Sequence, residues 1–128
     1  MTKEKYNYLS AEILDACIEV HKQLGPGLLE SAYQSALMVE FELRGIVAKQ
    51  KVAVPLYYKG IDTGKIYEID ILIEEEIILE LKATDILHPV FEAQLISYLK
   101  LTDKRLGFLI NFHVPLLKDG FRRFVNKF

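Results

Sequence analysis

Asp70, Glu80 and Lys82 are the residues of this chain whose types and spacing best suit chemistry. The sequence around them alternates with the two-residue period of a β-strand, over residues 66–73 and again over residues 77–83. In each strand one face is apolar throughout, and the other face carries Asp70 in the first strand and Glu80 and Lys82 in the second. Carboxylates on one face can hold Mg²⁺, and a neighbouring lysine can stabilise the charge that develops during phosphodiester hydrolysis.

The segment that joins the two strands predicts how they pair. A three-residue turn at residues 74–76 pairs Ile73 with Ile77, and this register places Asp70 directly opposite Glu80. A one-residue slip would send the two carboxylates to opposite faces and would also mismatch the apolar faces. Carboxylates held opposite each other repel, so a bound divalent cation would compensate them.

A second interpretation of the same register needs no metal ion. Glu68 lies opposite Lys82, and the two side chains would form a cross-strand ion pair on a solvated face. Asp70 would then be half exposed and without a chemical role. Spacing alone leaves both interpretations open.

Polar residues on two predicted helices favour the metal site. Glu30 shares a helical stripe with Tyr33, and Gln94 and Tyr98 share another with Leu95. Each polar residue taken singly is explained as a satisfied core residue. Polar groups that face inward from two helices and a hairpin together indicate a site.

The remaining patterns predict the elements that position these side chains. Ser10 predicts the start of the first helix, and Gly25-Pro26-Gly27 ends it. Further helices and strands are expected over residues 28–44 (helix), 50–58, 65–73 and 77–83 (strands), 90–101 (helix), and 106–112 and 121–125 (strands). With no linker or internal repeat, residues 1–128 form one α/β (α+β) domain, with a mixed central sheet flanked by helices.

Composition excludes several classes of protein. Cys17 is the only cysteine, which excludes internal disulfides and multi-cysteine metal sites, and the three histidines lack zinc-ligand spacing. Cys17 lies on the apolar stripe of the first helix and is expected in the core. No apolar run has the length of a membrane helix, and residues 1–8 do not resemble a secretory signal, so we expect no membrane association and a cytoplasmic location.

Charge is distributed unevenly along the chain. The net charge is −2, which argues against a protein that coats DNA through a uniformly basic surface. Residues 99–128, however, carry seven basic and two acidic side chains. This segment is either an edge that contacts phosphates or a solvated edge strand kept soluble by Lys and Arg.

Four blocks of sequence carry a resemblance to a known family. Residues 27–33 read GxxExxY, residues 70–82 read D-x₉-E-x-K, residues 94–98 read QxxxY and residues 107–112 read GFLINF. In this order the blocks resemble the GxxExxY proteins, a branch of the PD-(D/E)XK nuclease-like superfamily. The resemblance extends from about Ile13 to Arg123, although position 69 holds Ile instead of the superfamily's Pro.

The resemblance implies a fold and a set of roles. The fold would be the restriction-endonuclease-like αβββαβ core with an extra N-terminal helix. The implied roles are metal binding by Asp70, Glu80 and Glu30, catalysis by Glu30, Asp70, Glu80, Lys82 and Gln94, and substrate binding by Tyr33 and Tyr98. The implied cofactor is Mg²⁺, with Mn²⁺ as a substitute.

Three functions remain open on the sequence. The first is a Mg²⁺-dependent nuclease that cleaves phosphodiesters in nucleic acid, with DNA ahead of RNA. The second is a non-catalytic metal-binding or regulatory module that pairs with another chain or with itself as a homodimer. Candidate surface aromatic residues such as Tyr57 and Tyr58 favour that function. The third is an enzyme that hydrolyses phosphoesters of small nucleotides.

Overall fold

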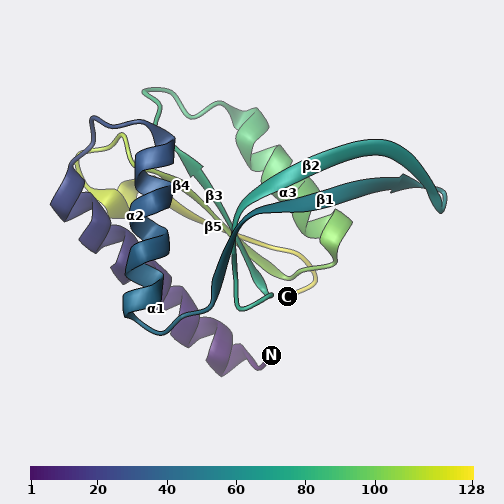
Figure 1. Ribbon diagram of the computed structural model, residues 1–128, viewed down its shortest axis with the longest axis horizontal. Coiled ribbons are helices and arrows are strands. Elements are labelled where there is room, and N and C mark those ends of the chain that lie inside the picture. Colours follow the sequence, from purple (N-terminus) through teal and green to yellow (C-terminus); the bar gives the residue numbers. More distant parts are fainter.

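A computed structural model describes residues 1–128 as helices packed on a five-stranded sheet (Figure 1). The elements are α1 (Lys3–Leu24), α2 (Glu30–Leu43), β1 (Ala48–Tyr58), β2 (Ile61–Ile73), β3 (Ile77–Lys82), α3 (Pro89–Thr102), β4 (Leu106–Asn111), the short 3₁₀ helix η1 (Leu117–Gly120) and β5 (Phe121–Val125). Their order is the predicted one, and the α+β class is confirmed. None of the helices is both long enough and apolar enough to cross a membrane.

The first helix begins earlier than the sequence patterns predicted. α1 starts at Lys3, where the Thr2 hydroxyl accepts a hydrogen bond from the Lys5 amide at 3.1 Å and so caps the helix. Ser10, the predicted cap, lies inside the helix and donates to the Tyr6 carbonyl at 2.7 Å. A serine hydroxyl can bond to the carbonyl one turn earlier, so its presence does not require a helix start. The predicted end is correct, because α1 stops at Gly25.

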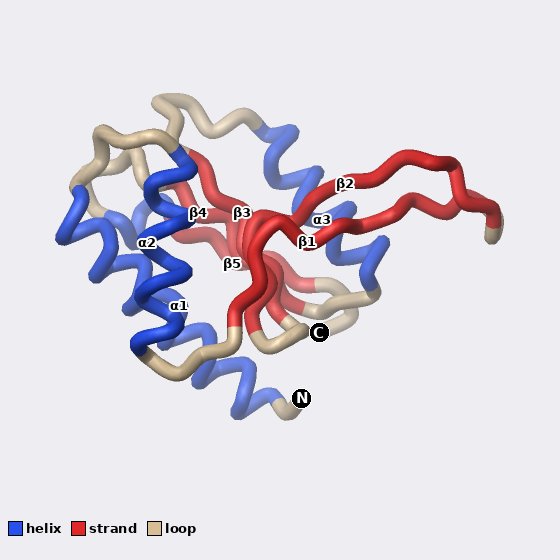
Figure 2. The backbone as a smooth tube through the Cα atoms, in the orientation of Figure 1, coloured by secondary structure: helices blue, strands red, loops and turns tan.

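The sheet is mixed, as predicted. Its strand order is β1-β2-β3-β4-β5, and only β3 and β4 run parallel, joined by the crossover helix α3 (Figure 2). In the β2–β3 pair Ile73 lies opposite Ile77 and Ile71 opposite Leu79, which is the predicted register. The edge strand β5 carries part of the basic C-terminal segment.

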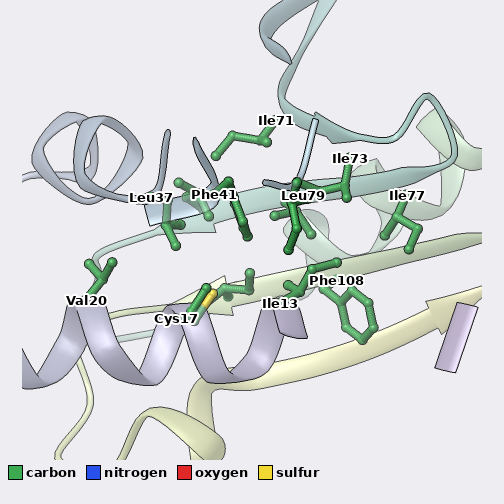
Figure 3. Close-up of a cluster of buried hydrophobic side chains, with 14 of the residues drawn as sticks. Ile13, Cys17, Val20, Leu37, Phe41, Ile71, Ile73, Ile77, Leu79 and Phe108 are labelled. Carbon is green, nitrogen blue, oxygen red and sulfur yellow. The ribbon is translucent and has the colours of Figure 1, made fainter. Parts of the chain in front are cut away.

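Helices cover both faces of the sheet and create two apolar clusters. On one face α1 and α2 pack against β3 and β4, and Figure 3 shows Ile13 and Cys17 of α1 among these buried side chains. On the other face α3 packs through Leu95 and Leu99. Cys17 is fully buried, as expected for a small core residue, and burial raises the pKa of its thiol. Both faces of β3 are therefore buried, and polar groups on it lie in a dry environment.

Strand β2 does not keep the simple alternation that the sequence predicted. Ile71 belongs to the cluster under α1 and α2, whereas Ile69 belongs to the cluster under α3. In a regular strand, residues two positions apart point to the same side of the sheet. Ile69 and Ile71 point to opposite sides, so the alternation of side chains is broken at Asp70. Across from Asp70, the regular β1–β2 pairing is interrupted at Lys51, whose φ of 54° is left-handed. The predicted continuous apolar face of β2 is therefore wrong at this point.

From Val52 to Ile69, strands β1 and β2 pair only with each other and form a long curved hairpin that extends away from the body of the molecule (Figures 1 and 2). Its turn is Lys59-Gly60, and both residues have positive φ, as a tight two-residue hairpin turn requires. The hairpin curves over α3, and its tip exposes Tyr57 and Tyr58. This arm forms one wall of the groove described below.

Candidate active site

Asp70 and Glu80 meet where β2 separates from β3. The regular pairing between these strands ends at Ile71 and Leu79, and side chains continue the contact beyond that point. The Asp70 amide donates to Oε1 of Glu80 at 3.2 Å, and the Leu81 amide donates to Oδ2 of Asp70 at 2.8 Å. Each carboxylate thus replaces a backbone carbonyl that a continuous ladder would have supplied. The two carboxylates therefore hold the strands together at the point where the backbone pairing of β2 with β3 ends.

The two carboxyl groups lie in a poorly solvated position. Only 5% of Glu80 is exposed, and burial, followed by the charge of Asp70, raises the pKa of Glu80 to about 9. Burial also raises the pKa of Asp70, although the Leu81 amide and the charge of Lys82 oppose that rise. Burial and mutual repulsion therefore favour one proton shared by the pair at neutral pH when no cation is bound. A divalent cation that displaces this proton would find two oxygen donors already together.

Lys82 is the last residue of β3 and lies beside the carboxylates. Its charge lowers the pKa of both Asp70 and Glu80, although less than burial raises each of them. The ammonium Nζ lies 4.2 Å from the centroid of the Phe91 ring in the first turn of α3, a cation–π contact that holds the side chain. Its half-buried position is favourable for a charge that acts on a substrate phosphate.

The metal-free interpretation of this face is wrong in one respect. Glu68 and Lys82 form no ion pair in the structure. The reason is the separation of the strands: β2 pairs with β3 only from Ile71 to Ile73, so residues before Asp70, including Glu68, do not lie opposite β3. Lys82 is therefore not neutralised by a cross-strand partner.

Helix α2 approaches Asp70 through a residue that the sequence patterns did not single out. The side-chain amide of Gln34 donates to the Asp70 carbonyl at 3.2 Å and to Oε1 of Gln50 at 3.3 Å. These bonds stabilise the strand at the turning point and fix the distance between α2 and the sheet. Its only sequence signal is its position directly after Tyr33 in the motif.

The structure does not place Glu30 on the buried stripe. Glu30 is the first residue of α2 and is exposed, one helical turn before Gln34. No group of three or more His, Cys, Asp and Glu side chains is placed to hold a metal ion. The prediction that Glu30 faces inward is therefore wrong: the first residue of α2 is exposed, although Tyr33, three residues later on the same stripe, is completely buried. Asp70 and Glu80 alone come together.

Tyr33 packs in the hydrophobic core. It is completely buried, and its ring stacks on Phe112 with centroids 4.4 Å apart. Its hydroxyl donates a hydrogen bond to the Gly25 carbonyl and accepts one from the Leu28 amide at 3.1 Å. A side chain buried in this way does not reach a substrate. It fixes the loop between α1 and α2 instead.

Gln94 and Tyr98 lie on α3 but in different environments. Tyr98 is 5% exposed, and burial, followed by the charges of Glu80 and Asp70, raises the pKa of its hydroxyl to about 12. Gln94 is exposed, so the prediction that it faces the core is wrong. Both residues line a cavity of about 570 Å³ between α3 and the β1–β2 hairpin, together with Tyr67. The structure therefore brings Tyr98 to the carboxylates and leaves Gln94 on the cavity wall.

A buried amide network supports the ends of the central strands. Asn111 pairs with Lys82 across the parallel strands, and its side chain exchanges hydrogen bonds of 3.2 and 3.0 Å with the backbone of Thr84. The same side chain accepts the His113 amide at 3.2 Å. Gly120 packs so closely that a Cβ there would lie 2.2 Å from the Asn111 carbonyl oxygen. The signal in the sequence was a polar residue within an otherwise apolar strand.

One of three comparisons with known proteins identifies a family for this chain. A family model described as PD-(D/E)XK nuclease superfamily matches residues 7–124, which is nearly the whole chain. Neither a search of curated proteins nor a search of solved structures gave a significant match. The matched range contains Asp70, Glu80 and Lys82.

Proposed function

Because the chain belongs to the PD-(D/E)XK nuclease superfamily, we propose that it hydrolyses phosphodiester bonds in nucleic acid with a divalent cation held by Asp70 and Glu80. The observation that carries the proposal is the buried carboxylate pair at the point where β2 leaves β3. Burying two acids side by side raises their pKa values and is unfavourable unless a cation or a proton compensates them. DNA is the proposed substrate ahead of RNA, and the proposed location is the cytoplasm.

The donor set fits Mg²⁺. This ion commonly takes one or two protein carboxylates and completes its octahedral shell with waters and substrate phosphate oxygens. The two acids that the structure brings together satisfy that requirement without a third protein ligand. Mn²⁺ accepts the same oxygen donors. When bound, the cation would offset the charge of the carboxylates and polarise the phosphodiester.

The remaining residues act on the substrate or on the site. Lys82, held over Phe91, stabilises the negative charge that develops on the phosphate. Glu30, exposed at the start of α2 one turn before Gln34, would complete or support the metal shell from the open side of the site. Gln94 orients the bound strand from the cavity wall. Tyr33 supports the site indirectly by holding the loop that precedes α2.

Cleavage of labelled DNA and RNA strands in the presence of Mg²⁺ or Mn²⁺ tests the proposal. The wild-type protein should cleave, and Asp70→Asn and Lys82→Ala should each reduce the rate by about 100-fold or more. Lys22→Ala, which removes an exposed lysine in the last turn of α1, is the matched control and should keep full activity. Cleavage that survives Asp70→Asn would show a contaminating nuclease or a different site.

The exposed hairpin favours a second candidate, a non-catalytic partner module. Tyr57 and Tyr58 are 57% and 64% exposed at the tip of the β1–β2 arm, where they offer an apolar surface to a partner chain or to a second copy. This function predicts metal binding without cleavage of any substrate. It also predicts concentration-dependent self-association that Tyr57→Ser abolishes, which sedimentation would detect.

A further inference from the structure

A groove runs along α3 beside the carboxylate pair. Val90, Ala93, Gln94, Ser97 and Leu101 recur along α3 at helical spacing and form one wall. The curved β1–β2 hairpin forms the opposite wall, and Figure 1 shows it passing over α3. The cavity between them has a volume of about 570 Å³. None of the roles assigned so far accounts for a space of this size.

The groove is aromatic at its base and has free polar groups. The rings of Tyr67 and Tyr98 lie there with centroids 5.9 Å apart. The hydroxyl of Tyr98 makes no hydrogen bond within the protein, yet no buried polar atom lacks a partner, so this hydroxyl opens into the groove. Gln94 and Ser97 are also exposed on its wall. Apolar walls with a few free hydrogen-bonding groups are typical of a site for a flat heteroaromatic ligand.

The base of the groove packs against the strands that carry the candidate active site. Tyr98 belongs to the same buried cluster as Ile69 of β2 and Ile78 of β3. Phe91, which holds Lys82, is the residue that follows Val90 of the groove. A ligand in the groove would therefore lie on the α3 side of the sheet, next to the strands that carry Asp70 and Glu80.

Lysines lie on both sides of the aromatic floor that Tyr67 and Tyr98 form. Nζ of Lys65 lies 5.9 Å from the Tyr67 ring centroid on the hairpin side, and Lys100 lines the groove on the α3 side. Neither lysine forms an ion pair with an acidic side chain. Aromatic surfaces for bases with free cations for the backbone are the combination that binds single-stranded nucleic acid.

We infer that this groove binds an unpaired nucleobase next to the scissile phosphodiester, so that the substrate is single-stranded nucleic acid or a strand end. The inference rests on the proposed function and names its substrate class. A base inside a duplex is stacked between its neighbours and cannot enter such a groove without leaving the helix. Contacts to phosphates alone would make no use of the aromatic floor of the groove, which Tyr67 and Tyr98 form.

Binding measured by fluorescence anisotropy in Ca²⁺ tests the inference. The probes are an oligothymidylate of about twelve nucleotides, a strand of equal length in which every base is replaced by an abasic site, and a duplex of equal length. The abasic strand keeps all phosphates and loses only the bases. We expect the wild-type protein to bind oligothymidylate about ten-fold or more tightly than either of the other probes.

Two tryptophan variants identify the groove as the source of this preference. Ala93→Trp fills it from an exposed position of α3 and should bind oligothymidylate and the abasic strand equally. Val39→Trp adds the same ring at an exposed position of α2, outside the groove, and should retain the wild-type preference. Tyr67→Ala gives a second route to the same loss if Ala93→Trp does not fold.

Several outcomes would overturn the inference. These are equal binding of the normal and abasic strands by the wild-type protein, no binding of any strand, or a preference that Ala93→Trp and Tyr67→Ala both retain. Self-association that Ala93→Trp abolishes would instead assign the groove to a second copy of the chain. Cleavage without base preference would overturn only the groove, whereas base preference without cleavage would overturn only the hydrolytic function.

Discussion

Asp70 and Glu80 each accept a hydrogen bond from the backbone of the other's strand. The amide of Asp70 donates to the Glu80 carboxylate at 3.2 Å, and the amide that follows Glu80 donates to the Asp70 carboxylate at 2.8 Å. The carboxylates therefore serve the fold and the proposed chemistry at once. Substitutions that keep their shape separate these two roles.

Asp70→Asn and Glu80→Gln should remove metal binding and leave the fold intact. Each amide keeps an oxygen that can accept the backbone hydrogen bond, while the repulsion between two buried acids disappears. We expect metal-free stability to be unchanged or higher by about 1 kcal/mol, roughly 3–5 °C in Tm. Isothermal titration of Mg²⁺ and Mn²⁺ beside thermal melting measures both quantities. A large loss of metal-free stability in both variants would assign the pair a structural role.

Metal-free stability should fall as pH rises from about 5 to 9. The folded protein holds a proton on Glu80 up to a pKa of about 9, whereas the unfolded chain releases it near 4.5. Between these values unfolding releases a proton, so the free energy of unfolding decreases with pH. Thermal melts in chelator across this range should show the decline, and Glu80→Gln should flatten it. Saturating Mg²⁺ should reduce the decline in the wild-type protein, because the cation binds the deprotonated pair.

Lys82→Ala should separate metal binding from catalysis. The lysine contacts Phe91 and acts on the carboxylates through charge, but it is not a ligand candidate. We expect cleavage to fall by about 100-fold or more while titration still detects the metal. Phe91→Leu keeps an apolar side chain but removes the ring, and it should cause a smaller loss. Full activity in Lys82→Ala would exclude the lysine from the reaction.

Tyr33→Phe should destabilise the protein without changing KM. It removes the hydroxyl that joins Gly25 and Leu28, so the free energy of unfolding should fall by about 1–3 kcal/mol. Tyr57→Phe removes a hydroxyl that makes no hydrogen bond and should melt like the wild-type protein. Urea unfolding and steady-state kinetics provide the two measurements. An increase in KM at unchanged stability would restore the predicted substrate contact.

Glu30→Gln should lower kcat by about ten-fold or more and change stability by less than about 1 kcal/mol. The residue is exposed at the start of α2, where an acid is favourable beside the helix dipole, and it forms no ion pair. Glu42→Gln, an exposed acid near the other end of the same helix, is the matched control. Equal activity of the two variants would exclude Glu30 from the site.

The sequence by itself determined the centre of the site. Turn length and the matching apolar faces specify the pairing of β2 with β3, and that register places Asp70 and Glu80 together in the structure. Both constraints are local, because they act between strands joined by a three-residue turn, Glu74–Glu76. The order of the elements, the mixed sheet and the superfamily also followed from patterns along the chain.

Only the tertiary structure decided what surrounds that centre. Periodicity assigns a residue to a stripe of a helix but does not decide whether another element covers that part of the stripe, so Glu30 and Gln94 were wrongly expected to face inward. The contacts of Gln34 with Asp70 and of Lys82 with Phe91 join segments that are distant or separated by a loop. They depend on how α2 and α3 dock on a sheet whose strands part at Asp70. That docking results from long-range packing, which local spacing does not encode.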